Sequence, residues 1–413
     1  MKETNPNKIQ VLAPAGSFET LQAAIQGGAD SVYFGVGDLN MRSRAANHFT
    51  IGDLDEVVKR CEEHGVKTHV TLNSVMYDRD LPQVQEICDA LKKSGVHAVI
   101  AHDIAVIMYA QSIEIPTHIS TQVNVCNFQA VKYYAQYADV IVLARELNLE
   151  QIRSICDNIQ KEHICGPGGE LVKIEVFVHG ALCVAISGKC YMSLAQQNAS
   201  ANRGECQQMC RRKYRVTDED TGKELVLDNQ YIMSPKDLCT IEYLDQMIDA
   251  GASVLKIEGR GKAPEYVYAV TKAYREAVDS IGEGTYSKEK IEKWKSGLEK
   301  VYNRGFWHGG YYLGNPLGEW SGTYGSKATR KKEYIGKTTN YFAKSGVGEF
   351  LFEAGTVESG DQVMVVGPTT GVLEFTISSM REHIEGSDKR IFTIPTPEKV
   401  RRNDKLYLFK NRV

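Results

Sequence analysis

Long apolar runs are missing from this sequence of 413 residues. No stretch approaches the roughly 20 apolar residues that a membrane-spanning helix requires. The segment MKETNPNKIQ at residues 1–10 also lacks an apolar core of the length found in signal peptides. We therefore expect a cytoplasmic protein with no membrane partner, in a compartment where thiols stay reduced.

Several catalytic and cofactor motifs are absent as well. The sequence contains no HExxH, no GxSxG and no CxxC, and Gly35 and Gly37 do not continue into a dinucleotide-binding GxGxxG. These absences argue against a zinc protease, a serine hydrolase, a zinc ribbon and a dinucleotide fold. The net charge is only −3, so a nucleic-acid partner would need a local basic patch.

Short apolar runs alternate with amphipathic segments over the first 280 residues. Strands are predicted at 9–13, 31–35, 67–72, 97–101, 117–120, 140–144, 173–178 and 253–258. Helical periodicity separates most of them, and glycines such as those of GGAD and DAGAS mark the helix ends. Eight strands, each usually followed by a helix, favour a (β/α)8 TIM-like barrel over an open doubly wound sheet.

The chain divides into three predicted parts. Residues 1–280 form the barrel, with a cysteine-rich insertion at 183–239, after the seventh strand. Residues 281–332 are a helical and Gly/aromatic connector. Residues 333–413 contain short alternating strands and turns, which predict a small C-terminal β-barrel domain.

Five cysteines occupy the insertion with the spacing Cys183-x6-Cys190-x15-Cys206-x3-Cys210-x28-Cys239. Four or more thiols in one cytosolic insertion typically bind metal. Irregular spacing favours an iron–sulfur cluster over zinc, and the basic segment CRRKYR would offset the charge of a thiolate-bound cluster. Unrelated buried cysteines and a disulfide remain the alternatives.

The segments LAPAGSFETLQAAIQGGADSVYFG, STQVNV, VFVHGALCVAISGKC, NRGECQQMCRRKY, SPKDLC and KIEGR resemble the signature blocks of the collagenase-like U32 peptidase family, in the same order. The resemblance covers nearly the whole chain and is strongest to the branch that hydroxylates tRNA. It implies a [4Fe–4S] cluster and oxygen-independent, prephenate-dependent conversion of the tRNA wobble uridine to 5-hydroxyuridine. In some branches a paralogous family member acts as a partner.

The resemblance leaves other functions open. They are hydroxylation of another RNA or of a quinone precursor, collagenase-like peptidase activity, and a non-catalytic role as the iron–sulfur partner of a paralogue. Carried over residue by residue, it places the cluster ligands at Cys183, Cys190, Cys206 and Cys239, with Cys210 as a spare or alternative ligand.

Barrel enzymes place their chemistry at the carboxyl ends of the strands. The predicted catalytic residues there are His179, Glu258 and Arg260, for which buried rim contacts are the alternative role. Residues suited to a dicarboxylate such as prephenate, the candidate co-substrate, are Arg42, Arg44, Gln122, Asn124 and Arg145. The arginines could equally hold phosphate or cap carboxylates.

A basic segment adjoins the cysteines and predicts contact with tRNA. Its cations are Arg203, Arg211, Arg212, Lys213 and Arg215, and Tyr191 and Tyr214 are available for base stacking. Charged loops are more often simply solvated, so the basic segment alone does not establish an RNA site.

Overall fold

A computed structural model describes residues 9–43, 48–215, 217–222, 233–314, 319–323, 325–383 and 390–412. Arg44, predicted to bind substrate, lies outside the described residues. Within these ranges no helix is both long and apolar enough to cross a membrane.

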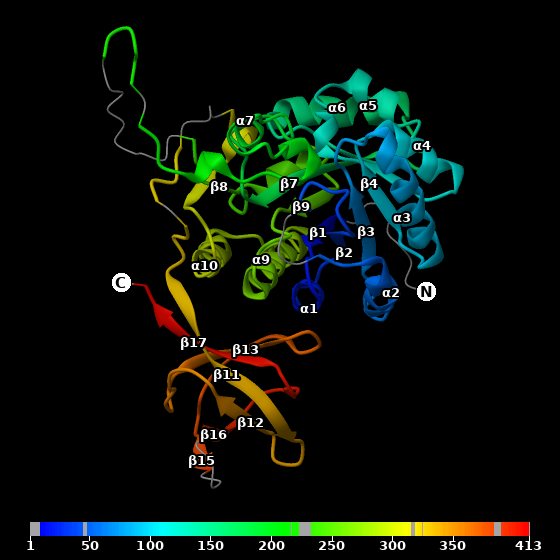
Figure 1. The fold of residues 1–413 in the computed structure, drawn as a ribbon. Helices are drawn as coiled ribbons and strands as arrows, with labels where there is room; N and C mark the ends of the chain where they lie inside the picture. The colour runs from blue at the N-terminus through cyan, green and yellow to red at the C-terminus, as the bar shows by residue number, and fades with distance from the viewer. Residues whose placement is uncertain are drawn as a thin grey trace.

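Eight parallel strands close into a barrel (Figure 1). They are β1 (Gln10–Pro14), β2 (Ser31–Gly35), β3 (Lys67–Leu72), β4 (Ala98–Ala101), β5 (Thr117–Ile119), β6 (Val140–Val142), β7 (Lys173–Gly180) and β9 (Val254–Ile257). Each strand from β1 to β7 pairs with the next, and β9 pairs with both β7 and β1. The predicted (β/α)8 barrel is confirmed and the open sheet is wrong, because the β7–β9 pairing closes the ring.

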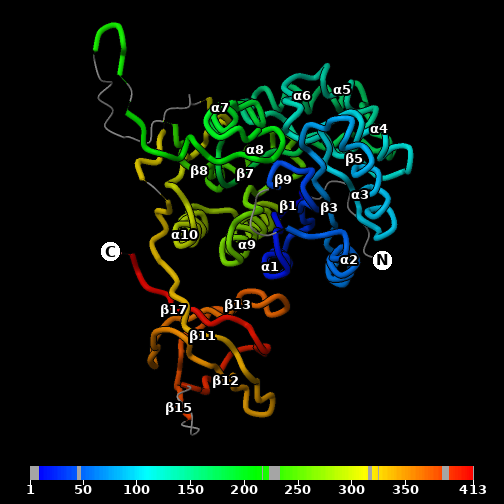
Figure 2. Tube along the Cα trace, viewed as in Figure 1, coloured from blue at the N-terminus to red at the C-terminus, as the bar shows by residue number. Residues whose placement is uncertain are grey.

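Helices surround the barrel (Figure 2). They are α1 (Phe18–Gln26), α2 (Leu54–Glu62), α3 (Leu81–Lys93), α4 (Ile104–Ser112), α5 (Phe128–Tyr134), α6 (Leu149–Glu162), α8 (Leu244–Asp249) and α9 (Pro264–Gly282). Local sequence sets their ends: the Ser17 hydroxyl caps α1, and Pro264 occupies the first turn of α9.

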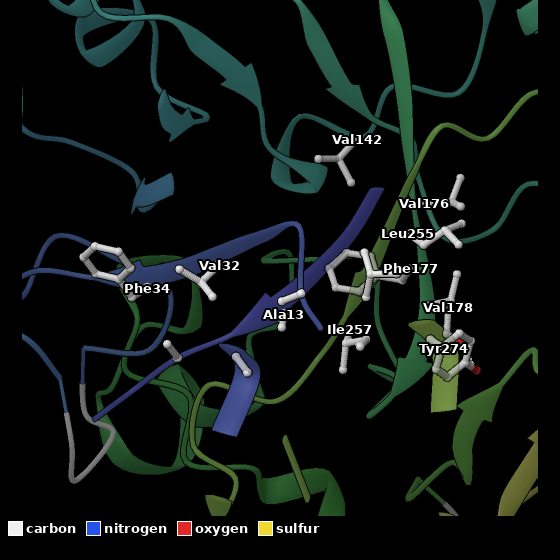
Figure 3. Packing of buried hydrophobic residues seen from close by; sticks show 14 of the residues in the cluster. Ala13, Val32, Phe34, Val142, Val176, Phe177, Val178, Leu255, Ile257 and Tyr274 are labelled. Atoms are coloured by element: carbon white, nitrogen blue, oxygen red, sulfur yellow. Dashed lines mark hydrogen bonds between the residues drawn. The ribbon is translucent and has the colours of Figure 1, made fainter. Parts of the chain in front are cut away.

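Neighbouring residues of one strand face opposite sides of the barrel wall. Ala13, Val32 and Phe34 belong to the main core between strands and helices (Figure 3), whereas Leu12 and Tyr33 belong to a smaller cluster with Ile100, Val140 and Val254. This alternation is the period of two expected of a strand. The barrel interior is therefore filled with packed side chains, which support a site at the ends of the strands.

The cysteine-rich insertion leaves the barrel after β7. It contains α7 (Met192–Gln197) and returns as β8 (Asp237–Cys239), which pairs antiparallel to β7 through His179 and Cys239. β10 (Phe306–His308) then pairs in parallel with β8. Gly204 turns the chain with φ +85°, and a Cβ there would lie 2.1 Å from the Asn40 carbonyl oxygen, so only glycine fits.

After α10 (Lys288–Glu299) the chain forms a seven-stranded antiparallel sheet in the order β14-β13-β17-β11-β12-β16-β15. The strands are β11 (Arg330–Phe342), β12 (Val347–Phe352), β13 (Gln362–Gly367), β14 (Gly371–Thr376), β15 (Arg381–His383), β16 (Arg390–Pro395) and β17 (Lys405–Asn411). This sheet has its own core around Phe350, Ile394 and Leu406. β14 and β15 are the two edge strands, and among the described strands no pairing joins them to each other.

Two boundaries drawn from the sequence fall inside elements. Residue 280 lies within α9, and residue 332 lies within β11. The C-terminal sheet also contacts the barrel directly. The Gln26 amide donates to the Thr370 carbonyl oxygen at 2.9 Å and accepts from the Val372 amide at 2.9 Å, which joins α1 to the turn between β13 and β14.

Candidate functional site

A cavity of about 180 Å³ opens where the barrel strands end and the insertion begins. Its wall combines residues from the ends of β2, β3, β5, β6, β7 and β9 with residues of the insertion. The carboxyl ends of all eight strands meet at this mouth, so residues far apart in the sequence converge there. Two features distinguish the cavity, a set of thiols and a set of cations.

Four of the five insertion cysteines line the cavity: Cys183, Cys190, Cys206 and Cys210. The thiols of Cys183 and Cys206 belong to exposed residues, whereas Cys190 and Cys210 are half-buried. Burial raises the pKa of Cys210, the neighbouring Arg211 lowers it, and the other three thiols raise it. The four sulfurs therefore share one electrostatic environment.

Cys239 is placed elsewhere. It lies at the end of β8, is 0% exposed and does not line the cavity. Burial raises the pKa of its thiol to about 12, partly offset by hydrogen bonds from the Ile241 backbone and the Tyr274 side chain. The cavity thus contains three of the four cysteines predicted as ligands, together with the one predicted as a spare.

The donor chemistry of the four cavity thiols fits a cluster of the iron–sulfur class, which is held by thiolates. In the ranges described, no three Cys, His, Asp or Glu side chains converge closely enough to hold a metal ion. The residues therefore match such a cluster in kind and number, while their present positions are not those of bonded ligands.

Arg42 and Glu258 form an ion pair across the cavity mouth. The Arg42 Nη2 donates to Glu258 Oε1 at 2.8 Å. Burial by itself would raise the pKa of Glu258, but Arg42, Lys262 and Arg145 outweigh it and bring the pKa down to about 2. The surrounding cations therefore favour the charged form of Glu258, which is the counterion of Arg42.

Arg260 and Arg145 line the same cavity but differ in their partners. Arg260 donates to Asn40 Oδ1 at 3.0 Å and to Thr71 Oγ1 at 2.6 Å, and burial lowers its pKa to about 10. Arg145 lies over the Phe177 ring at 4.0 Å and donates to the Ala181 carbonyl oxygen, but its buried Nε has no hydrogen-bond partner among the described residues. Arg145 thus retains donor capacity for a ligand.

Of the remaining barrel residues predicted for the site, one lines the cavity and two do not. Gln122 lines the cavity. Asn124 does not, and adopts the left-handed conformation with φ 60° at the end of a short helical turn. His179 is also absent from the wall: it is buried against Tyr274 and Phe306, and burial lowers its pKa to about 3. A neutral histidine in that position packs like a core residue.

Two of the predicted RNA-binding arginines have structural partners. Arg203 pairs with Asp80 at 2.5 Å and lies over the Tyr77 ring at 4.5 Å. Arg211 donates to the carbonyl oxygens of Pro235 and Leu182 and to the Ser234 hydroxyl. Both side chains therefore tie the insertion to the barrel or to itself.

The other basic residues of the segment are exposed. They are Arg212, Lys213 and Arg215, which lie two to five residues after Cys210 in the chain. Tyr191 is 75% exposed beside Cys190, whereas the Tyr214 hydroxyl donates to the Met209 carbonyl oxygen. Fewer basic and aromatic side chains of this segment are thus available to a polyanion than the sequence indicated.

Sequence reasoning overlooked one pair in the cavity floor. Lys256 Nζ donates to Glu175 Oε1 at 2.7 Å, and both side chains are buried. The signal was present, because Glu175 is the one charged residue of the segment IEVFV and Lys256 is the one charged residue of SVLKI. Two neighbouring strands with one unlike charge each favour a buried pair.

The fold and the site define a TIM-barrel protein whose mouth carries clustered thiols and arginines. The model of Peptidase family U32 matches residues 16–322, and the chain belongs to this family. A protein of Porphyromonas gingivalis named "Collagenase" is 50% identical over 412 residues, covering 99% of both chains.

Two further relatives have names that refer to RNA. The "tRNA hydroxylation protein P1" of Bacillus subtilis is 31% identical and covers 92% of this chain and 88% of its own length. The "23S rRNA 5-hydroxycytidine C2501 synthase" of Escherichia coli is 37% identical over 67% of this chain, which corresponds to 40% of that longer protein.

Proposed function

We propose that this protein is an iron–sulfur RNA hydroxylase that converts the wobble uridine of tRNA to 5-hydroxyuridine with prephenate as co-substrate. The observation that carries the proposal is the joint placement of Cys183, Cys190, Cys206 and Cys210 around one arginine-lined cavity. Relatives named for tRNA and rRNA hydroxylation support the reaction class. Hydroxylation of a different RNA is the nearest variant of this proposal.

In the proposed site, the four cavity cysteines hold a [4Fe–4S] cluster, and Cys210 replaces Cys239 in the ligand set expected from the resemblance. A cluster of this kind supplies electron transfer when bound. The chain's own residues provide the rest: thiolates for the cluster, and guanidinium groups in the same cavity for the carboxylates of a co-substrate. Arg145 is suited to the latter role because it lines the cavity.

RNA would approach over the exposed basic residues Arg212, Lys213 and Arg215. Phosphates bind such cations, and a base unstacked from an anticodon loop can stack on an exposed aromatic ring. Tyr191 offers such a ring beside Cys190. This arrangement supports entry of a single nucleotide toward the thiols.

The proposal is tested by mass spectrometry of tRNA nucleosides from a strain that lacks this gene and from the same strain carrying it. Loss and recovery of 5-hydroxyuridine derivatives are expected. Anaerobically purified protein should be brown and contain iron. Unchanged tRNA nucleosides together with altered rRNA nucleosides would transfer the proposal to ribosomal RNA, and no change in either would refute it.

A peptidase is the second candidate, because a relative at 50% identity is named "Collagenase". Cysteine peptidases need a base beside the nucleophile, and no histidine lines the described cavity wall. The test is cleavage of gelatin and native collagen by the anaerobic protein and by a Cys183→Ala/Cys206→Ala variant. Cleavage that depends on both thiols would favour the peptidase.

A further inference from the structure

Lys256 lies at the floor of the cavity, between two aromatic rings. Its Nζ is 4.6 Å from the centre of the Tyr33 ring and 5.5 Å from that of Phe177, and all three residues line the cavity. Its side chain is 6% exposed. The amine is therefore shielded from bulk water but adjoins the space that a ligand would occupy.

The partner of Lys256 is a carboxylate with spare acceptor capacity. Glu175 Oε1 accepts from Lys256 at 2.7 Å, whereas Glu175 Oε2 is buried with no hydrogen-bond partner among the described residues. A buried pair of this kind is costly to desolvate and is weak support for stability by itself. Glu175 is well placed to take a proton from the lysine, because one of its oxygens already contacts Nζ.

The groups around Lys256 favour a reactive amine. Burial lowers its pKa, Glu175 raises it, and Arg260 and Arg145 lower it further. Two more titratable groups face it from β3 and β5, His69 and His118, and burial lowers the pKa of both. A lysine that is desolvated and close to other cations is the usual form of an amine nucleophile.

A ligand that reaches Lys256 also meets the arginines. Arg145 and Lys256 both lie against the Phe177 ring, with the guanidinium at 4.0 Å from its centre. Arg42 lines the same cavity. An amine beside guanidinium groups matches a molecule that carries a carbonyl next to a carboxylate.

We propose that Lys256 forms a reversible imine with a 2-oxo acid whose carboxylate is held by Arg145 and Arg42. Prephenate contains a pyruvyl side chain and belongs to this class. The inference rests on the small-carboxylate part of the proposed function, and it does not depend on RNA being the second substrate. It assigns the ligand class and the atom that binds it.

The step balances without an oxidant. The Lys256 ammonium gives a proton to Glu175, and the free amine attacks the ketone carbon to form a C–N bond. The oxygen of the resulting carbinolamine takes up one proton from the attacking nitrogen and one from Glu175, and the C–O bond breaks to release water. A protonated C=N bond remains, and Glu175 is again a carboxylate. Hydrolysis reverses the sequence and returns the free lysine and the 2-oxo acid.

The test is reductive trapping with borohydride, using pyruvate as the probe. Purified protein with its metal content intact is incubated with pyruvate, treated with sodium borohydride, digested and mapped by mass spectrometry. We expect N-(1-carboxyethyl)lysine at position 256, in excess over every other lysine. Prephenate should compete with pyruvate for this modification, and lactate, which has no carbonyl, should leave no adduct.

Three variants distinguish loss of imine formation from loss of the folded structure. Lys256→Arg keeps the charge beside Glu175 and should abolish the adduct, and Glu175→Gln should slow its formation at least tenfold. Because Lys256→Met would bury an unpaired Glu175, the double variant Lys256→Met/Glu175→Gln serves as the neutral control for folding. A trapped adduct spread over exposed lysines, or no adduct on wild-type protein that binds pyruvate by calorimetry, would overturn the imine.

The outcomes also distinguish this inference from the proposed function. Pyruvate binding without trapping rejects the imine and leaves the carboxylate site standing. Absence of any binding by pyruvate and prephenate rejects both. Trapping at Lys256 in a protein that alters neither tRNA nor rRNA nucleosides supports the imine and rejects the RNA substrate.

Discussion

Arg42 and Glu258 connect the segment after β2 to the end of β9 through a hydrogen bond of 2.8 Å. The pair bridges the ends of β2 and β9 across β1, which lies between these two strands. Glu258 also accepts weakly from the Ala181 amide at 3.4 Å, which links this pair to the start of the insertion. One carboxylate therefore ties three parts of the cavity wall together.

Replacement of Glu258 by Gln should lower stability in a pH-dependent way. The folded-state pKa of about 2 lies below the unfolded value, so the contribution is present above about pH 4.5 and is lost as the pH falls toward 2. We expect a loss on the order of 2–3 kcal/mol at pH 7. Urea unfolding of both proteins from pH 7 to pH 3 measures the difference, which should shrink below about pH 4.5.

The control is Glu56→Gln, which removes the exposed ion pair between Glu56 and Arg60 on α2. Such a surface pair contributes little, so its effect should be small at every pH. A Glu258→Gln penalty that stays constant across the pH range would contradict the electrostatic explanation.

We expect four of the five insertion cysteines, but not the fifth, to be required for retention of the cluster. Cys183→Ala, Cys190→Ala, Cys206→Ala and Cys210→Ala should each lower the iron content and bleach the protein, because each removes a thiol from the cavity wall. Cys239→Ala should retain iron and lose only about 1 kcal/mol of stability, as expected for a small core truncation. Iron and sulfide assays with visible spectra provide the measurement.

Cys88→Ala is the matched control, since Cys88 is also 0% exposed and lies in α3, outside the insertion. It should resemble Cys239→Ala in both iron content and stability. Loss of iron from Cys239→Ala with retention in Cys210→Ala would restore the ligand set first expected from the resemblance.

The exposed basic residues should govern tRNA affinity. Arg212→Glu/Lys213→Glu should weaken binding at least tenfold and reduce its dependence on salt, because phosphate contacts release counterions. Iron content should not change. Filter binding at several salt concentrations measures both effects, with Lys92→Glu/Lys93→Glu at the end of α3 as the control of equal charge. Equal weakening in both variants would indicate a general charge effect.

Arg211→Ala should weaken the structure of the insertion, whereas Arg212→Ala should not. The Arg211 guanidinium holds Leu182, Ser234 and Pro235 together, so its loss should expose the insertion to proteolysis and lower iron content. Limited trypsin digestion followed over time, with Arg212→Ala as the control, measures this. Normal resistance in Arg211→Ala would show that these hydrogen bonds do not hold the insertion.

The Gln26 side-chain amide makes two of the hydrogen bonds that join the barrel to the C-terminal sheet. Gln26→Ala removes both of its hydrogen bonds to the turn between β13 and β14. The Val372 amide should then exchange with solvent roughly tenfold faster, the equivalent of one net hydrogen bond of about 1.4 kcal/mol. Hydrogen exchange measured by NMR tests this, with Gln22→Ala, one turn earlier in α1, as the control.

The sequence by itself determined the barrel and the location of its insertion. Segments such as SVYFG and KTHVTL became β2 and β3 with the predicted bounds, because β-branched and aromatic residues favour strands. The sequence also predicted that one cavity mouth is lined by Arg42, Arg145, Glu258 and Arg260. The carboxyl ends of barrel strands converge at one face of the barrel, regardless of the loops that follow them.

Only the tertiary structure decided which side chains face the cavity. The resemblance ranked Cys239 above Cys210 as a ligand, but the antiparallel pairing of β8 with β7 places Cys239 in the core, opposite His179. Arg203 likewise finds Asp80 at a separation of 123 residues, and Lys256 finds Glu175 at a separation of 81. Burial and ion pairing depend on such distant partners, and local periodicity carries no information about them.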